Sequence, residues 1–365
     1  MLHMRNCHNR RVASTRRSPA SRRVAVPIFA SMLIAAFVLN ACSSSTGPGT
    51  GGVSLWVSNI NANTILGYSA TQLKSSTNAA PAVVIGTPPG AGAPPISGNT
   101  GIAFDRSGNL WVAEGGTSPN MLVMYASSQL GASNTPKPAV TITSFDATDS
   151  AALFGPFALA FDASGDLWVA NVGPQGGTLL EFTSSQLAAS GNPRPAVAIT
   201  GNGGSVSDPQ AIAFDRAGNL WVANEADIVE FSASQIGSSG SPVPAVTLDY
   251  PSPRTISPSG LAFDHDGNLW VSSNLTSALY EFTPSQLLAS GNPAPATALN
   301  ASGKTGGLSE PVAIAFDRSG NLWVTSVTNT VSEFLASQLK TSGAPAAALT
   351  ISGSALALPI ALAFR

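Results

Sequence analysis

Charged residues, cysteine and histidine are scarce in this sequence. Only 10% of the 365 residues are charged, and the chain has 2 cysteines and 3 histidines. A charged fraction so far below the usual ~25%, with hydrophobic residues spread along the whole length, excludes a disordered polyampholyte and a coiled coil. The net charge of -2 argues against nucleic acid as a partner, because nucleic-acid-binding surfaces carry an excess of Lys and Arg.

The first 41 residues have the layout of a secretory signal. Seven arginines without any acidic residue come first, and an apolar run over 24–38 follows. The next residues, Leu39-Asn40-Ala41-Cys42, resemble a bacterial lipobox, in which the Cys is diacylated and becomes the first residue of the mature protein. We therefore predict a lipoprotein-type signal peptide over 1–41 and lipidation of Cys42. A lipid anchor would hold the protein in the bacterial cell envelope, on a membrane outside the cytoplasm.

Two other interpretations of this segment remain open. An ordinary signal could be cleaved near Ala41, or the apolar run could stay as an anchor helix. The run is short for a full membrane span, which needs ~20 residues. Residues 42–52 are rich in Ser, Thr and Gly, and this composition predicts a flexible tether between the membrane and a folded domain.

Removal of residues 1–41 would leave an acidic chain with few reactive side chains. Seven of the 17 basic residues and none of the 19 acidic residues would go, which leaves 10 against 19 and a net charge of -9. A surface of this charge does not adsorb to phosphates or to anionic lipid. Among cysteines and histidines only Cys42 and His265 remain, so an acylated Cys42 leaves no thiol for a disulfide, a nucleophile or a metal ligand.

Six repeats of about fifty residues fill the rest of the chain. Each contains one Leu-Trp-Val tripeptide, and successive Trp residues are 55, 57, 53, 49 and 53 positions apart. Four segments recur: an apolar run before an Asp, the Trp segment, a segment ending in Phe or Tyr, and a variant of Pro-Ala-Val-x-Ile. Each is short, rich in Val, Ile, Phe and Trp, and bounded by Gly, Pro, Asn or Ser, which predicts a strand. The Trp residues are Trp56, Trp111, Trp168, Trp221, Trp270 and Trp323.

The link between the first two segments, Asp-x-x-Gly-Asn, predicts a hairpin turn. The Asp carboxylate can accept local backbone N–H groups, and Gly can take the positive-φ position. In the Trp segment, Leu and Val point to one face of the sheet and Trp to the other, so both faces are apolar and each needs a neighbour. A closed ring meets this requirement. We predict an all-β, six-bladed β-propeller with four-stranded antiparallel blades over residues 53–365.

The two ends of the repeat region complement each other. The first Trp segment, 53–57, has no partner strand upstream, and the chain finishes on a first segment, 359–364, without its Trp partner. We predict that the C-terminal strand pairs with the N-terminal blade and closes the ring. A Ser-Gln-Leu piece before the fourth segment predicts one helical turn. A recurrent Ala in the first segment predicts an innermost strand, where blades crowd the axis; these residues are Ala103, Ala160, Ala213, Ala262, Ala315 and Ala363.

The phrase Pro-x-[Gly/Ala]-[Ile/Leu]-Ala-Phe-Asp-x-x-Gly-Asn-Leu-Trp-Val resembles the blades of NHL-repeat propellers. It is also similar to the blades of streptogramin (virginiamycin B) lyase and of the gluconolactonase group. The resemblance covers residues 53–365 and implies a propeller fold. These relatives include scaffolds, ligand binders and enzymes, so the resemblance leaves the function to be argued from the site.

The resemblance implies two kinds of enzyme site, and the residues of this chain support neither of them well. Gluconolactonase-like propellers hold a divalent metal partly through residues five positions before the hairpin Asp, and no carboxylate stands there in this chain. That position holds Thr100, Phe157, Gln210, Ser259, Val312 and Ile360. Streptogramin lyase relies on a His base and a bound cation, but His265 lies in a hairpin turn at the opposite end of its blade. We therefore predict no catalytic residue, no metal and no cofactor.

A polar residue follows the Trp segment in every repeat and predicts a ring at the axial mouth of the propeller. The ring would bind a small polar ligand, a peptide or a glycan. Alternatively, these side chains satisfy loop backbone, as Asn and Ser commonly do at strand ends. The members of this polar ring are Asn59, Glu114, Asn171, Asn224, Ser273 and Ser326.

Carboxylates also recur before the aromatic residue of the third segment. Because they lie on four different blades, we predict solvated positions without a paired partner for acid–base chemistry. These residues are Glu181, Glu230, Glu281 and Glu333. The leading hypothesis is thus an exported, membrane-tethered binding or scaffold domain without catalytic activity. The alternative is a metal-assisted lactonase or a streptogramin-lyase-like enzyme that uses the polar ring.

Overall fold

The repeat region, which the sequence predicts to form a propeller, consists of short strands and tight turns. The structure, a computed structural model, describes residues 53–365 except 76–77, 79, 87–95, 117–118, 145–148, 150, 174–175, 202–204, 251–255 and 301–307. The predicted signal peptide (1–41), Cys42 and the tether (42–52) lie outside the described residues. Within the described part, no helix is long and apolar enough to cross a membrane.

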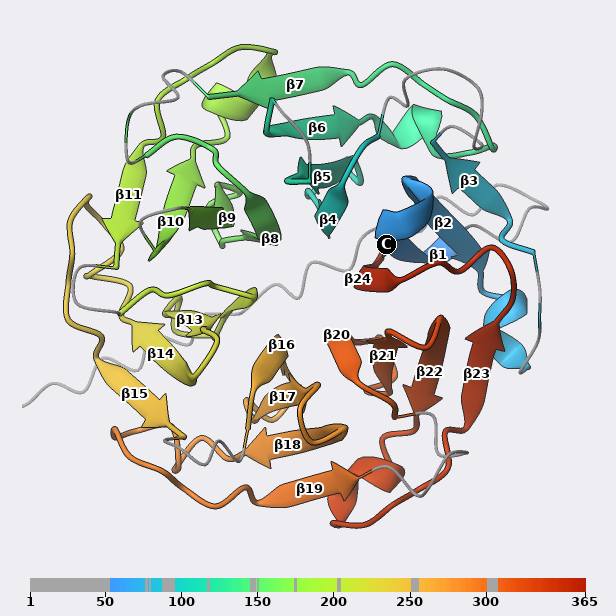
Figure 1. Cartoon of the computed structure of the whole chain (residues 1–365), viewed down its shortest axis with the longest axis vertical. Coiled ribbons are helices and arrows are strands. Elements are labelled where there is room, and N and C mark those ends of the chain that lie inside the picture. The colour runs from blue at the N-terminus through green and yellow to red at the C-terminus, as the bar shows by residue number, and fades with distance from the viewer. Residues whose placement is uncertain are drawn as a thin grey trace, which may run out of the picture. The chain divides into compact units, whose positions relative to one another are not determined.

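Six four-stranded antiparallel sheets form the blades of a ring (Figure 1). Blade 1 contains β24 (Pro359–Phe364), β1 (Val53–Asn59), β2 (Thr64–Ser69) and β3 (Val83–Ile85). Blade 2 contains β4 (Asn99–Phe104), β5 (Leu110–Glu114), β6 (Met121–Tyr125) and β7 (Val140–Thr143). Blade 3 contains β8 (Pro156–Phe161), β9 (Leu167–Gly173), β10 (Gly176–Phe182) and β11 (Val197–Thr200). Blade 4 contains β12 (Ala211–Phe214), β13 (Leu220–Ala223), β14 (Asp227–Phe231) and β15 (Val246–Asp249). Blade 5 contains β16 (Pro258–Phe263), β17 (Leu269–Ser273), β18 (Ala278–Phe282) and β19 (Thr297–Asn300). Blade 6 contains β20 (Pro311–Phe316), β21 (Leu322–Ser326), β22 (Thr330–Phe334) and β23 (Leu349–Ser352). The predicted six-bladed propeller is confirmed.

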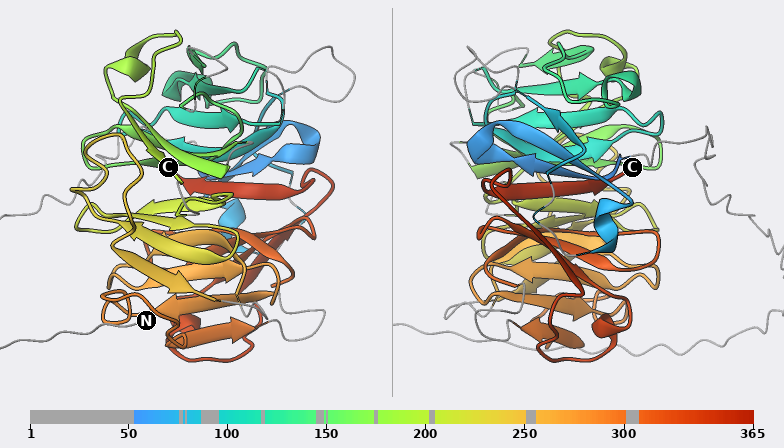
Figure 2. Two further views of the ribbon diagram at one scale, coloured as in Figure 1. Left: turned by 60° about the vertical axis from the view of Figure 1, so that its left-hand side comes forward. Right: turned by 90° about the vertical axis from the view of Figure 1, so that its right-hand side faces the viewer.

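The last strand of the chain closes the ring. β24 pairs with β1 in antiparallel register, from Leu55 opposite Phe364 to Asn59 opposite Pro359. Figure 1 and the right-hand view of Figure 2 both show β24, in red, beside the blue N-terminal strands. The prediction that the C-terminal strand completes the N-terminal blade is therefore confirmed.

Each Trp lies in the interface between its own blade and the next. All six indoles are at most 2% exposed. Trp111, for example, packs in one core cluster with Leu167 and Val169 of the following Trp strand. Trp323 packs in the same way with Leu55 and Val57, which brings the last blade onto the first. The two-sided apolar pattern of the Trp strand thus builds one hydrophobic cluster in every interface of the ring.

The Asp-x-x-Gly-Asn turns form as predicted, and blade 4 shows the full pattern. One oxygen of the Asp215 carboxylate accepts the backbone N–H groups of Ala217 (2.8 Å) and Asn219 (2.9 Å). The other oxygen accepts the Asn219 side-chain amide (2.8 Å) and the Trp221 indole N–H (3.2 Å). Gly218 has φ +84°, which L-residues rarely adopt. The same carboxylate therefore closes the turn and anchors the buried Trp.

The outer edge of a blade is covered by a segment of the next blade. Gly191 of blade 3 bridges Ile142 of β7, donating its N–H to Thr141 O and accepting the N–H of Thr143, both at 3.0 Å. The hydroxyl of Ser190 also accepts the Thr141 N–H at 3.0 Å. The equivalent bridges are Ile85–Asn134, Ile199–Gly240, Leu248–Gly291 and Leu299–Gly343. Outer strands covered in this way offer no free edge for pairing with another chain.

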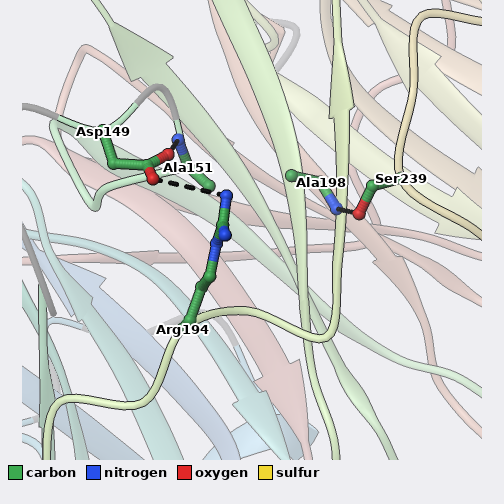
Figure 3. A network of polar contacts seen from close by, with 5 residues as sticks. All are labelled: Asp149, Ala151, Arg194, Ala198 and Ser239. Carbon is green, nitrogen blue, oxygen red and sulfur yellow. Dashed lines mark hydrogen bonds and ion pairs between the residues drawn. The ribbon is translucent and has the colours of Figure 1, made fainter.

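Figure 3 shows one of these contacts beside an ion pair on the rim of blade 3. Ser239 accepts the N–H of Ala198 at 3.0 Å. Arg194 forms an ion pair of 3.3 Å with Asp149, which lies in the loop before β8 and also accepts the N–H of Ala151 at 2.8 Å. The covering segments begin with the predicted helical turns, which are 3-10 helices at η2 (Gln72–Lys74), η3 (Ser127–Gln129), η4 (Gln186–Ala188) and η6 (Gln338–Lys340). A further 3-10 helix, η1 (Ile60–Ala62), follows β1.

Candidate functional site

The two ends of the propeller carry different connections. The Asp-x-x-Gly-Asn hairpins lie at one end, which we call the turn face. The connections between blades, and those between the second and third strands of a blade, lie at the other end, which we call the crossover face. The polar ring lies at or near the ends of the second strands and therefore belongs to the crossover face. His265 lies in the β16–β17 turn on the turn face and is exposed. The predicted placement of His265 away from the polar ring is confirmed.

The innermost strands enclose an axial cavity of about 120 Å³. Five of the six residues that stand five positions before the hairpin Asp line it, namely Thr100, Phe157, Gln210, Ser259 and Ile360. The position used for metal binding in the gluconolactonase group does therefore reach the axis in this chain. Its side chains are neutral.

Six small residues form the next tier of this cavity and were not singled out from the sequence. They are Gly101, Ala158, Ala211, Gly260, Ala313 and Ala361. A Cβ at Gly101 would lie 2.6 Å from the carbonyl oxygen of Phe157 in the next blade, and one at Gly260 would lie 2.5 Å from Val312 O. At Gly101 and Gly260 the next blade therefore lies too close to leave room for a Cβ.

The recurrent Ala of the innermost strand, two positions after each of these small residues, does not have the predicted role at the axis. Ala103 lies opposite Trp111 across β4 and β5, and Ala363 lies opposite Trp56. The other four pair with the Trp of their own blade in the same way. These Ala residues are on the innermost strands, as predicted, but their small size makes room for an indole and does not relieve crowding at the axis.

Hydrogen bonds already occupy most of the polar groups in the cavity wall. Thr100 donates its hydroxyl to Pro156 O at 2.6 Å, and Ser259 donates to Pro311 O at 2.8 Å. Gln210 uses its side-chain amide N–H on Asp208 O at 3.0 Å, which leaves its side-chain carbonyl as an acceptor. No ionisable side chain of the described residues lines the cavity. The wall can therefore bind neutral groups, but it holds no acid, base or charged metal ligand.

The polar ring lies beneath the crossover loops and not on an open mouth. Its six side chains are at most 2% exposed. Asn171 accepts the N–H groups of Phe154 (3.0 Å) and Gly155 (3.3 Å) and donates to Ala152 O (3.0 Å), all in the loop before β8. Corresponding bonds connect Asn59 with Ala355 and Ala357, Glu114 with Ser97, Asn224 with Ser205 and Ser207, Ser273 with Ser257, and Ser326 with Ser309. Each ring residue thus anchors the loop that leads into its own blade, which agrees with the alternative that these side chains satisfy loop backbone. Ligand binding by the ring stays a prediction.

Glu114 is the one carboxylate in the polar ring, and it is 2% exposed. Its Oε2 accepts the N–H of Ser97 at 2.5 Å, whereas its Oε1 is buried without a hydrogen-bond partner among the described residues. Desolvation by burial raises the pKa of Glu114 to about 8, against the opposing effect of the Ser97 hydrogen bond. Asn99, its cross-strand partner, also has a buried acceptor, Oδ1, without a donor. A proton would turn the partnerless Oε1 of Glu114 into a donor, and the raised pKa favours this neutral acid at pH 7.

Glu181 does not match the prediction that the third-strand carboxylates lack a partner. One oxygen from each of Asp162, Asp166 and Glu181 lies within 4.8 Å of the others, on the turn face of blade 3. Burial, followed by the charges of Asp166 and Asp162, raises the pKa of Glu181 to about 7. The sequence does hold a signal for this cluster, because Asp166 replaces the Asn that ends the turn motif in the other four complete turns.

Comparisons with known proteins support the fold. No protein-family model and no curated protein matches this chain. Among solved structures, a virginiamycin B lyase from Staphylococcus aureus is similar over 76% of both chains, at 16% identity and a TM-score of 0.47. A streptogramin B lyase is similar over 67% of both chains, at 17% identity and a TM-score of 0.43. A protein of unknown function from Bacteroides caccae matches over 85% of this chain and 98% of its own, at 11% identity and a TM-score of 0.57.

At these identities the likeness concerns the fold alone. As expected from the sequence, lyases of the streptogramin type are among the similar structures, and the six four-stranded blades themselves show the propeller. The resemblance to NHL repeats and the lipoprotein signal stay predictions.

Proposed function

We propose that this chain is an exported, lipid-anchored propeller that binds a neutral ligand at its axial cavity and does not catalyse a reaction on it. The observation that carries the proposal is the neutral cavity wall, which offers the carbonyl of Gln210 and apolar side chains but no ionisable group of the described residues. General acid–base catalysis needs a titratable group within hydrogen-bond reach of the substrate. A wall of this kind can select a ligand but cannot transfer its protons.

The size of the cavity limits the ligand class. About 120 Å³ corresponds to roughly four water molecules at ~30 Å³ each, well below the ~300 Å³ that a drug-sized ligand requires. A narrow uncharged group, such as the end of a peptide or of a glycan chain, fits this space. A donor on that group would meet the free carbonyl of Gln210.

The binding proposal is tested by the melting temperature of the purified protein in the presence of capped neutral dipeptides and neutral oligosaccharides. A ligand that binds the folded state raises the melting temperature. We expect a rise with at least one of these two classes, and loss of that rise in Gln210→Leu, which keeps the side-chain size but removes the amide. The control His265→Gln changes an exposed residue of the turn face and should respond like the wild type. Either no rise with any probe, or a rise that Gln210→Leu leaves unchanged, would contradict axial binding.

The membrane attachment in this proposal rests on the arginine-rich start, the apolar run over 24–38 and Cys42. Mass spectrometry of the mature N-terminus from the native host tests it. We expect a diacylglyceryl-modified Cys42 in the membrane fraction and a soluble product from Cys42→Ala. An unmodified N-terminus on soluble wild-type protein would refute the lipid anchor, and this outcome is independent of ligand binding.

A second candidate function, a lactonase or lyase activity, is favoured by Glu114 alone. A buried carboxyl group with its pKa raised to about 8 and a free oxygen is suited to act as a general acid near neutral pH. Turnover of lactones and streptogramins with added Mg²⁺ or Ca²⁺ distinguishes the two functions. We expect no turnover from wild type. Turnover that Glu114→Gln abolishes would establish the enzyme and overturn the binding-only proposal.

A further inference from the structure

The acidic cluster on the turn face of blade 3 contains the one complete turn that ends in Asp instead of Asn. In blades 2, 4, 5 and 6 the motif ends in Asn, and its side-chain amide donates to the Asp that begins the turn, at 2.8 to 3.0 Å. Blade 3 has Asp166 at this position. In blade 3 the donor, an Asn amide, is thus replaced by an acceptor, the carboxylate of Asp166, next to the carboxylate of Asp162.

Blade 6 shows one arrangement in which the amide also bonds the third-strand Glu. The side-chain nitrogen of Asn321 donates both to Asp317 Oδ2 at 3.0 Å and to Glu333 Oε1 at 2.9 Å. One N–H₂ group therefore holds two carboxylates together. Blade 6 is an internal template for the cluster of blade 3, because Asp162 and Glu181 occupy the positions of Asp317 and Glu333.

Asp166 takes the same place as Asn321 and leaves the centre of the cluster without a donor. Its Oδ1 accepts the N–H of Ser184 at 2.7 Å, as Asn321 Oδ1 accepts the N–H of Ala336 at 3.1 Å. One oxygen of Asp166 lies within 4.8 Å of an oxygen of each of the other two carboxylates. In the described part of the chain, none of the three carboxylates forms an ion pair with Lys or Arg. Among the described residues, three carboxylates therefore lie close together without a cationic side chain to balance their charge.

The buried indole of Trp168 gives a second and independent observation at this cluster, an N–H donor without an acceptor. In blades 2, 4, 5 and 6 the equivalent indole N–H donates to Oδ2 of the turn Asp, at 3.2 to 3.3 Å. Trp168 is 1% exposed, and its Nε1 has no partner. The N–H that donates to the turn Asp in those four blades is thus unpaired in blade 3, the complete turn that ends in Asp instead of Asn. A cation between the carboxylates would remove their repulsion and allow Asp162 Oδ2 to accept this bond.

We propose that Asp162, Asp166 and Glu181 bind a hard divalent cation of the Ca²⁺ type. Such ions take oxygen ligands, mostly carboxylates, and complete their shell with water. All three carboxylates are partly exposed, so water can reach the bound ion. The three residues lie on the turn face, and none of them lines the axial cavity, so this site is separate from the proposed function.

The test uses Ca²⁺ and Tb³⁺ as probes on the whole purified chain after treatment with a chelator. We expect millimolar Ca²⁺ to raise the melting temperature by several degrees, and one equivalent of Tb³⁺ to give luminescence on Trp excitation because Trp168 adjoins the site. Asp166→Asn, which restores the residue of the other turns, should lose both responses. The same variant should melt at or above the temperature of the metal-free wild type, because the amide again joins the carboxylates.

Two further variants make the result specific. Asp266→Asn removes an exposed carboxylate from the equivalent turn of blade 5 and should keep both responses in full. Trp168→Phe should keep the Ca²⁺ response and lose most of the sensitised luminescence. No Ca²⁺ response in wild type would overturn the site. Equal responses in wild type and Asp166→Asn would do the same, because binding would then reflect only the acidic surface.

Discussion

The two faces of the propeller hold their connections in place by different means. On the turn face, one carboxylate closes each complete hairpin by accepting N–H groups two and four residues further along, and this pattern recurs with distances of 2.8 to 2.9 Å. On the crossover face, Asn, Glu and Ser perform the same anchoring task on loops that are up to 298 residues away. A local motif can be repeated unchanged, whereas a non-local anchor must suit a different loop in each blade. The anchors of the crossover face therefore differ from blade to blade.

The largest loss of stability is expected where the two ends of the propeller pair, at β1 and β24. Deletion of residues 357–365 removes β24, and with it the whole inner partner of β1 and the Phe364 ring that packs against Trp323 at 5.9 Å. The exposed edge of β1 should then lead to aggregation or to loss of the cooperative melting transition. Removal of Arg365 alone, whose N–H donates to Ser54 O, should have a small effect. An unchanged melting curve after the longer deletion would contradict a closed ring.

The next effect comes from Glu114, the carboxyl group of the polar ring. Since the pKa of Glu114 is raised from its ordinary 4.5 to about 8, the folded state holds a proton that the unfolded state releases between these values. The free energy of unfolding should therefore fall as the pH rises through this window, by about 1.4 kcal/mol for each pH unit at most. Urea denaturation at pH 5, 6.5 and 8 measures this slope. Glu181, whose pKa is raised to about 7, adds a slope of the same sign below pH 7. Glu114→Gln mimics the protonated acid and should therefore remove the slope between pH 7 and 8 and part of it below pH 7, while keeping the stability seen at pH 5. An identical slope in both proteins would assign the titration to another group.

Anchors with more hydrogen bonds should contribute more stability. Asn171 makes three bonds to the loop before β8 and a fourth to Thr178, whereas Ser273 bonds only Ser257 and Thr276. Asn171→Ala should therefore lower the free energy of unfolding by about 2 to 4 kcal/mol, and Ser273→Ala by about 1 kcal/mol. Chemical denaturation of both variants gives the comparison. Equal losses would mean that burial and not hydrogen bonding sets the contribution of an anchor.

The smallest effect separates two turns of the turn face. Trp221 and Trp168 are both buried, but only Trp221 donates its indole N–H to a turn carboxylate. Substitution by Phe removes similar volume from both sites. Trp221→Phe should therefore destabilise the protein by about 1 kcal/mol more than Trp168→Phe, the usual net value of one hydrogen bond. Thermal denaturation without divalent cations measures the difference. An equal loss of stability in the two variants would show that the hydrogen bond of the Trp221 indole does not stabilise the protein.

The sequence predicts almost the whole fold because its signals are local and repeated. Alternating apolar residues, Gly at the positive-φ position of a turn and Asp at its start specify a hairpin wherever they occur. The count of Leu-Trp-Val tripeptides then predicts the number of blades. The incomplete first and last repeats predict the pairing of β24 with β1, because each lacks the strand that the other supplies.

The candidate site was less predictable, since it depends on how far apart the blades lie. The repeated Ala was assigned to the axis, but the structure places Gly101 and its equivalents there, two positions earlier. Both positions fit an inner strand, and nothing in the pattern says where along the strand neighbouring blades approach most closely. The polar ring was similarly predictable as a set of positions, but the burial of its side chains under the crossover loops was not.

By itself, the sequence determined the strands, the turns, the number of blades and the neutral character of the residues at the axis. Each of these follows from residue type and from spacing within one repeat. Only the tertiary structure decided which polar atoms are still free. Strand register brings Glu181 to Asp162 and Asp166, and the seating of a loop occupies one oxygen of Glu114 but not the other. Such pairings depend on distances between strands and between blades, and the spacing of residues along the sequence does not give these distances.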